Sequence, residues 1–271
     1  MNIADMHTHS ENSHDSICKI EDMVISQIKK GMHIFAVTDH ADIDSYKDYD
    51  IFTPIQRTYE TVKELRKKHN IRLLSGVEIS EGIWHPEISA KMKSLCDYDV
   101  IIGSVHCVRY KNMTQAYSTI DFSKFYEDEI NEFLDAYFND LLEVTEFEDF
   151  DILAHLTCPL RYITGKYGFK IDLSMFDAVI EKILKNIIKR DIALEINTSS
   201  YAVLNDFMPT RDIIKKYKKM GGEIITLGSD AHTSENASQN FDTAVKFLKE
   251  ISFNDLYYFE KRQAKKTVQT A

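Results

Sequence analysis

The chain has 271 residues, of which 44% are hydrophobic and 28% charged, and its formal net charge is -10 at pH 7. This length and composition allow a sizeable core in one α/β domain, and the acidic balance argues against a long polyanionic partner such as a nucleic acid. A small anionic substrate is not excluded, because bound metal ions can reverse the local field.

Cysteine use and the distribution of apolar residues bear on the cellular compartment. Cys18, Cys96, Cys107 and Cys158 form no C-x-x-C pair and suggest no disulfide framework. The sequence shows no basic segment followed by an apolar run at its start, and no apolar stretch near the roughly 20 residues of a membrane span. We therefore expect a cytoplasmic protein with reduced thiols and no membrane partner, present as a monomer or small homo-oligomer.

Short apolar segments alternate with amphipathic ones along the first half of the chain. Residues 2–6 are expected to form a short buried strand that leads into the pair His7 and His9. The elements expected next are a helix at 17–31, a strand at 34–38, a helix at 55–69, a strand at 71–77, a weaker helix at 86–95 and a strand at 100–105. Residues 109–123 show no clear period and are expected to form a long loop.

The second half continues the alternation. The expected elements are a helix at 125–145, a strand at 151–154, a helix at 173–189, a strand at 193–196, a helix at 210–220, a strand at 224–227, a helix at 235–250 and a final strand at 256–259. The basic tail 261–271 is expected to be frayed. Short apolar strands that alternate with helices predict a parallel sheet, and this number of units predicts a closed barrel in a single domain, 1–271.

Metal-binding residue types stand at the ends of the expected strands. They are His7, His9, His40, Glu78, His106, His155, Asp230 and His232. In a parallel barrel these strand ends meet on one face, where active sites form. Imidazole and carboxylate together suit Zn, Mn or Fe rather than Ca or Mg, and two or three divalent ions would account for so many ligands. Glu78 is the natural bridging ligand, because its two oxygens can contact two ions.

The motifs that carry these residues resemble those of the PHP (polymerase and histidinol phosphatase) family. In order they are Asp5-Met6-His7-Thr8-His9, Thr38-Asp39-His40, Gly76-Val77-Glu78, Ser104-Val105-His106, Ala154-His155 and Gly228-Ser229-Asp230-Ala231-His232. Within the family the chain is most similar to the free-standing histidinol-phosphate phosphatases, with supporting segments at 156–162 and 195–199. The resemblance implies a distorted (β/α)7 TIM-like barrel with a trinuclear metal site.

The resemblance also implies how the ligands divide among three ions. One ion would take His7, His9, Glu78 and Asp230, a second Glu78, His106 and His155, and a third Asp15, His40 and His232. Some relatives have a histidine at the position of Asp15. His14 therefore remains an alternative ligand for the third ion.

The activity that the resemblance implies is hydrolysis of L-histidinol phosphate to L-histidinol and phosphate, in histidine biosynthesis. Clustered divalent ions would neutralise the phosphate, and a bridging hydroxide would attack it. Glu78, Asp230 and His232 are the expected catalytic residues, and Asp230 or His232 would deliver the leaving-group proton. Three alternatives remain: a phosphatase for a nucleotide, sugar phosphate or phosphotyrosine, a nuclease, and a non-catalytic metal-binding protein. The acidic charge counts against the nuclease, and the complete ligand set counts against the last.

Arg161 is the main candidate for binding the substrate phosphate. It follows His155 by six residues, which would place it on the rim of the site. Guanidinium groups bind phosphate oxygens through two parallel hydrogen bonds. Arg109 and Arg211 are weaker candidates, and the loop 109–123, with Tyr110 and Tyr117, is a candidate lid.

Other polar residues near the strand ends have simpler explanations. Asp39 is expected to be hydrogen-bonded behind a metal ligand. Asp42, Asp44 and Glu81 are expected on solvated loops. Cys107 and Cys158 flank ligands and are expected to be buried filler.

Overall fold

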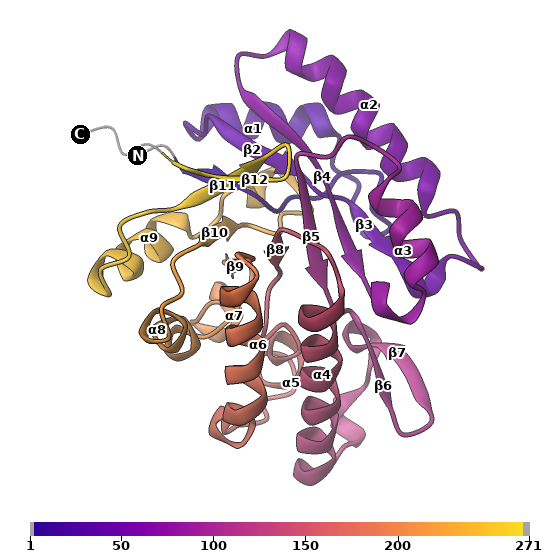
Figure 1. Cartoon of the computed structure of the whole chain (residues 1–271), viewed down its shortest axis with the longest axis vertical. Helices are drawn as coiled ribbons and strands as arrows, with labels where there is room; N and C mark the ends of the chain where they lie inside the picture. Colours follow the sequence, from indigo (N-terminus) through magenta and orange to yellow (C-terminus); the bar gives the residue numbers. More distant parts are fainter. Residues whose placement is uncertain (1–2, 268–271) are drawn as a thin grey trace.

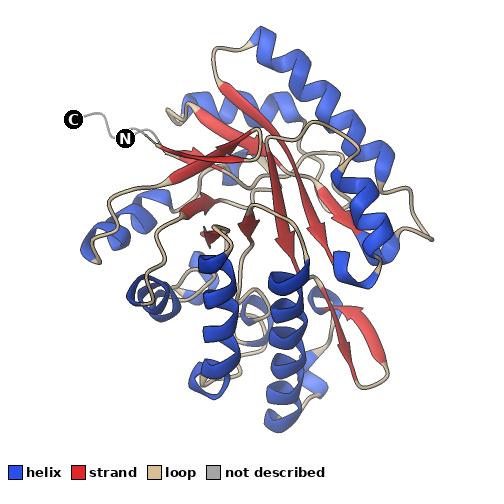
Figure 2. Cartoon of the chain, in the orientation of Figure 1, coloured by secondary structure: helices blue, strands red, loops and turns tan. Residues whose placement is uncertain are grey.

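The computed structural model of the chain describes residues 3–267. Its centre is a closed parallel barrel with helices around it (Figures 1 and 2). The barrel strands are β1 (Ala4–Asp5), β2 (Ile34–Val37), β4 (Arg72–Ser80), β5 (Val100–Ser104), β8 (Ile152–Leu153), β9 (Ala193–Asn197) and β10 (Ile225–Gly228). They follow one another in the order β2-β1-β10-β9-β8-β5-β4, and β2 pairs with β4 to close the ring. The expected distorted (β/α)7 TIM-like barrel is confirmed.

The pairing of β2 with β4, which closes the barrel, is interrupted partway along β4. Ile34 to Val37 pair with the first half of β4, and the chain then leaves the ladder. It returns as the short strand β3 (His40–Asp42), which pairs with the second half of β4 so that His40 lies opposite Glu78. Two residues with metal-binding side chains thus meet at the same end of the barrel.

Helices cover the outside of the barrel (Figure 2). They are α1 (Ile20–Lys29), α2 (Phe52–Lys68), α3 (Pro86–Lys93), α4 (Glu127–Phe147), α5 (Leu160–Ile163), α6 (Asp177–Lys189), α7 (Tyr201–Leu204), α8 (Arg211–Lys219) and α9 (Phe241–Glu250). In α6 the buried residues Ile180, Ile183, Leu184 and Ile187 recur at helical spacing and form one apolar face. Each such side chain contributes about 1.5–3 kcal/mol on burial. No helix within residues 3–267 is long and apolar enough to cross a membrane.

The end of the barrel opposite the metal-binding residues is closed by a hairpin from the C-terminal segment. β11 (Tyr257–Glu260) pairs antiparallel with β12 (Gln263–Lys266), and Tyr258 and Phe259 join the apolar cluster inside the barrel. Arg262, between the two strands, donates a hydrogen bond to Asp151. The prediction of a frayed tail was wrong for 261–267, because buried aromatics and carboxylate partners hold this segment. Residues 268–271 lie outside the described residues.

The segment expected to be a long loop contains a second hairpin. β6 (Cys107–Tyr110) and β7 (Met113–Ala116) pair antiparallel, followed by two short 3-10 turns. The loop prediction for 109–123 was wrong because the strand signal is too short to detect: buried and exposed residues alternate over only the four residues of β6, and β7 has no buried residue. Tyr110 packs edge-on against Phe133 of α4, with ring centroids 5.7 Å apart. Tyr117 is buried beside the cavity described below.

Candidate metal centre

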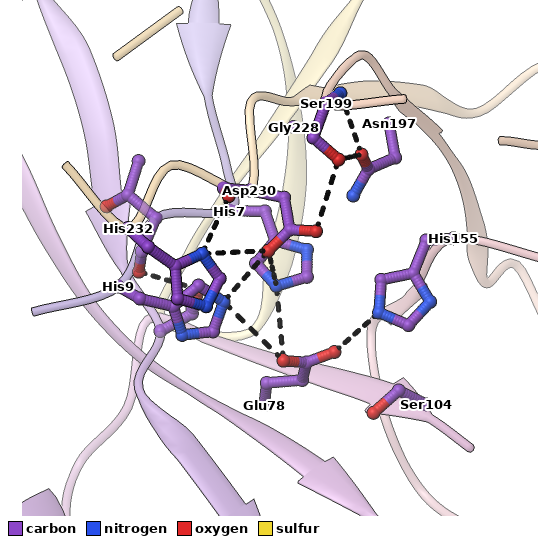
Figure 3. A network of polar contacts seen from close by, with 12 residues as sticks. His7, His9, Glu78, Ser104, His155, Asn197, Ser199, Gly228, Asp230 and His232 are labelled. Atoms are coloured by element: carbon purple, nitrogen blue, oxygen red, sulfur yellow. Dashed lines mark hydrogen bonds and ion pairs between the residues drawn. The ribbon is translucent and has the colours of Figure 1, made fainter. Parts of the chain in front are cut away.

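The residues with metal-binding side chains converge at the carboxyl ends of the barrel strands (Figure 3). A cavity of about 240 Å³ lies there, bordered by Asp15, His40, His106, His155, Asp230 and His232. His7, His9 and Glu78 lie beneath it and are fully buried. The structure therefore brings together all nine residues that were expected to bind metal, although they come from segments spread over the whole chain.

Glu78 occupies the centre of this cluster, and its two oxygens face different histidines (Figure 3). Oε2 lies 3.2 Å from His7 Nε2 and 2.9 Å from His40 Nδ1. Oε1 lies 3.2 Å from His106 Nε2 and 2.9 Å from His155 Nε2. This is the arrangement of a carboxylate that can bridge two ions, each held by its own histidines.

Two further carboxylates lie between pairs of histidines. Asp230 Oδ1 is 3.2 Å from His9 Nε2. Asp15 approaches His40 Nε2 at 3.5 Å and His232 Nε2 at 3.1 Å. The side chain of the alternative ligand, His14, also borders the cavity, but it is 68% exposed and lies 3.6 Å from Asp42. The geometry favours Asp15 as the carboxylate that completes a group with His40 and His232.

Several buried atoms of the cluster lie 2.9 to 3.2 Å from an atom of another cluster residue but form no well-directed hydrogen bond among the described residues. They are His7 Nε2, His9 Nε2, His40 Nδ1, His232 Nε2 and Glu78 Oε2. Leaving a buried polar atom unpaired costs about 1–3 kcal/mol. Because ligand atoms of these residues approach one another within 4.8 Å in groups of three, divalent ions would satisfy several of them at once. The nitrogen and oxygen donors fit Zn, Mn or Fe.

The charges of the cluster depend strongly on one another. Burial opposes ionisation of Glu78, but the neighbouring His7, His106 and His40 outweigh it and hold its pKa well below the usual range. Burial also opposes protonation of His40, yet Glu78 and Asp15 raise its pKa to about 10. The carboxylates thus require positive charge beside them. Either protons on the histidines or bound metal ions can supply this positive charge. The two compete, because an imidazole must be neutral to bind a metal.

The loop that carries Asp230 is held in an uncommon backbone conformation. Asp230 has a φ of 50° and His155 a φ of 42°, in the left-handed region that residues other than glycine rarely adopt. Buried Asp5, in the first motif, accepts hydrogen bonds from the backbone N–H and the hydroxyl of Ser229, at 3.0 and 2.6 Å. The first strand therefore positions the last metal-binding loop, although the two are more than 220 residues apart.

Asp39 has a similar supporting role, as expected. Its carboxylate accepts hydrogen bonds from Ser10, Ser13 and Thr58. The hydroxyl of Ser13 lies 3.1 Å from His9 Nδ1. Asp39 thus fixes the hydroxyl that orients the His9 ring.

Glu195 is the supporting residue that sequence reasoning missed. Its Oε1 lies 2.7 Å from His7 Nδ1, and its side chain is 1% exposed. A carboxylate can only accept, so Nδ1 donates and Nε2 is left free to face Glu78. A Cβ at Gly228 would overlap this carboxylate, so glycine is required there. An acidic residue in the middle of the buried strand β9 was the signal that could have revealed it.

We expect Glu195→Gln to weaken the metal site through His7. An amide is a poorer acceptor than a carboxylate, so the His7 ring becomes less well oriented and less basic. Loss of such an outer partner typically lowers metal affinity by about 10- to 100-fold. Titration of the metal-free protein against a competing chelator measures this, with exposed Glu223→Gln as the matched control. Equal affinities for both variants and the wild type would show that Glu195 does not act on the metal site.

The three candidate arginines occupy different environments. Arg161 borders the cavity, donates a hydrogen bond to Ser199, and lies 3.5 Å from Asp230 Oδ2. Arg109 pairs with Asp140 at 2.8 Å, and Arg211 pairs with Asp206 at 3.1 Å. Neither of these two borders the cavity. The structure therefore supports Arg161 and places the two weaker candidates elsewhere.

The expectations for four neighbouring residues need correction. Asp42 is not on a solvated loop, because its Oδ1 lies 3.1 Å from His106 Nδ1 and accepts a hydrogen bond from Ser80. Glu81 is 1% exposed. Asp44 and Cys107 are half-buried and border the cavity, whereas Cys158 is buried as expected. The three carboxylates are therefore less exposed than the solvated-loop prediction implied.

The fold and the site together define an α/β-barrel protein with a cluster of potential metal-binding side chains at the strand ends. Residues 5–199 match the PHP domain model, and the chain belongs to the PHP domain family.

Known relatives match nearly the full length of the chain. Two proteins named "Probable histidinol-phosphatase" are each 30% identical to it. The match to the protein from Clostridium acetobutylicum covers 97% of this chain and 99% of the relative. The match to the protein from Thermotoga maritima covers 93% of this chain and 94% of the relative. The crystal structure of histidinol phosphate phosphatase from Lactococcus lactis, complexed with Zn, L-histidinol and phosphate, has a TM-score of 0.76 at 23% identity and covers 97% of this chain and 99% of that chain. The expected enzyme class, a phosphoric monoester hydrolase similar to the histidinol-phosphatases, is confirmed.

Proposed function

We propose that this chain hydrolyses L-histidinol phosphate to L-histidinol and phosphate, using two or three divalent transition-metal ions. The observation that carries the proposal is the position of Glu78, whose two oxygens face separate groups of histidines beneath a cavity that Arg161 borders. The names of the full-length relatives support the reaction. The Zn, L-histidinol and phosphate bound to the Lactococcus lactis enzyme support the ligands.

In this proposal the main role of the protein is to bind the metal ions and to orient the substrate. Glu78, Asp230, Asp15 and the histidines hold the ions, which when bound would supply Lewis acidity and a water molecule of lowered pKa. Arg161 contacts phosphate oxygens that the ions leave free, through its forked guanidinium. Burial lowers the pKa of Arg161, but Cys158 and Asp230 outweigh this and raise it, so the group stays charged. Asp230 and His232 both border the cavity, where either can pass a proton to the leaving oxygen.

The shape of the site supports a small phosphorylated partner rather than a nucleic acid. The cavity of about 240 Å³ is enclosed by Tyr117, Tyr162 and the metal-binding residues, and suits one small molecule. The net charge of -10 points the same way, because nucleic-acid sites usually present a basic face. The cytoplasmic location, the monomeric or small homo-oligomeric state and the single domain 1–271 stay predictions.

We expect the metal-loaded protein to release phosphate from L-histidinol phosphate with a kcat/KM at least about tenfold higher than for other monoesters. Small differences in the contacts between pocket and substrate commonly give discrimination of this size. A panel of a nucleoside monophosphate, a sugar phosphate, phosphotyrosine and single-stranded DNA tests this, alongside metal analysis of the same sample.

Each alternative gives a distinct result in that panel. Faster phosphate release from another ester would identify that ester, rather than L-histidinol phosphate, as the substrate. DNA cleavage without phosphate release would favour the nuclease. A protein that binds no metal after addition of Zn or Mn would contradict the whole proposal.

A further inference from the structure

A second group of metal-binding side chains lies beside the nine-residue cluster and shares no residue with it. Asp44, Glu81 and Cys107 each offer one ligand atom, and these atoms lie within 4.8 Å of one another. Asp44 follows β3, Glu81 follows β4 and Cys107 begins β6, so side chains from three separate segments meet here. None of the nine cluster residues is a cysteine, which makes this group chemically different from the first.

Glu81 is the feature of this group that points to a ligand. Its side chain is 1% exposed, and its Oε2 has no hydrogen-bond partner among residues 3–267. Its other oxygen, Oε1, is held by the backbone N–H groups of His106 and Cys107, at 2.5 and 2.9 Å. The carboxylate is thus fixed by one oxygen while the other is buried and unpaired, which is unfavourable unless a ligand binds it.

The backbone and the surrounding charges agree with this. Glu81 has a φ of 51°, in the left-handed region that residues other than glycine rarely adopt, so its backbone is held in an uncommon conformation. Within residues 3–267, no lysine or arginine forms an ion pair with Asp44 or Glu81. Two carboxylates and a thiol therefore lie together without a lysine or arginine partner, and the basic side chain that does act on Glu81 is that of His106, a member of the nine-residue cluster.

We propose that Asp44, Glu81 and Cys107 form an additional site for a thiophilic divalent cation such as Zn²⁺. Thiolate favours Zn²⁺ over Mg²⁺ or Ca²⁺, and the carboxylates complete a set of three protein ligands. Asp44 and Cys107 border the cavity, which gives the ion a route of entry and leaves one coordination position open to it. Glu81 closes the site from the buried side. This inference does not depend on which phosphate ester the chain hydrolyses.

Cobalt substitution tests the site through its thiolate. We expect the metal-free full chain, titrated with Co²⁺, to develop a thiolate-to-cobalt charge-transfer band in the near ultraviolet. Histidine and carboxylate ligands give no such band, so the larger cluster does not contribute to it. Cys107→Ser is expected to abolish the band, and the matched control Cys158→Ser, at another cysteine bordering the cavity, to retain it.

Variants of the carboxylates provide the second measurement. Asp44→Asn, at a half-buried position, and Glu81→Gln are expected to lose the band and to bind one Zn²⁺ fewer per chain than the wild type. A wild type without the band, or a band that survives Cys107→Ser, would overturn the proposal. Unchanged metal content combined with a raised KM in Glu81→Gln would overturn it too, because the group would then serve the substrate. Phosphate release by the wild type is assayed separately, so failure of the proposed function remains distinguishable.

Discussion

Glu78→Gln is expected to lower kcat by roughly 10³-fold or more and to reduce the amount of bound metal, because bridging ions supply several kcal/mol of transition-state stabilisation and each 1.36 kcal/mol is about tenfold in rate. Each oxygen of Glu78 faces its own pair of histidines, at 2.9 to 3.2 Å. Glutamine keeps the shape of the side chain but has one oxygen and no charge. It can hold one ion at most and cannot link two.

The control for this variant is an exposed glutamate of the same chemistry. Glu60 is 57% exposed, and among residues 3–267 its one ion pair is with Lys63, its neighbour on α2. Glu60→Gln is expected to leave turnover and metal content unchanged. Steady-state kinetics and metal analysis of both variants test this prediction. If Glu78→Gln keeps the turnover and metal content of the wild type, Glu78 is not a bridging ligand.

Arg161→Met is expected to lower kcat/KM by about 2 to 4 kcal/mol, roughly 30- to 900-fold, which is the scale of one buried charge-assisted contact to the substrate. The Arg161 side chain is 25% exposed at the edge of the cavity and is oriented by Ser199 and Asp230. Methionine has similar length but no donors. Arg161→Lys is expected to recover only part of the loss, because a single ammonium cannot reproduce the guanidinium fork.

The other two candidate arginines serve as matched controls. Arg109 and Arg211 are bound to Asp140 and Asp206 away from the cavity, so Arg109→Met and Arg211→Met are expected to keep kcat/KM within about twofold of the wild type, as for most surface changes. Because Arg161 lies 3.5 Å from Asp230, metal content is measured for every variant and rates are compared at full occupancy. Unchanged kcat/KM in Arg161→Met would exclude it as the phosphate-binding residue.

Much of the barrel could be predicted from local sequence. Apolar runs of four or five residues, such as 34–37 and 100–104, alternate with helices whose buried face repeats every three to four residues. These signals are strong because the strands are buried on both sides. The candidate metal ligands were detectable for a related reason: polar residues that follow the buried strands of a parallel barrel lie at the same end of it.

Local sequence failed where pairing between distant segments decides the structure. The hairpin of β11 and β12 is stable because Tyr258 and Phe259 insert into the barrel and Arg262 reaches Asp151, and none of this is visible in a basic tail. The hairpin of β6 and β7 has one buried face only. Its alternation of buried and exposed residues covers only the four residues of β6, and β7 has no buried residue, so the sequence signal is weak and the packing of β6 against α4 decides the structure.

By itself, the sequence determined the strand–helix alternation, the family and the set of ligand types, because these depend on residue chemistry and spacing along the chain. Tertiary structure alone decided how the ligands are grouped. It placed one oxygen of Glu78 toward His7 and the other toward His155, brought Asp15 beside both His40 and His232, and set Glu195 behind His7. It also buried Glu81 beside Cys107. These outcomes depend on side-chain directions and distances between strands far apart in sequence, which closure of the barrel fixes and spacing along the chain does not contain.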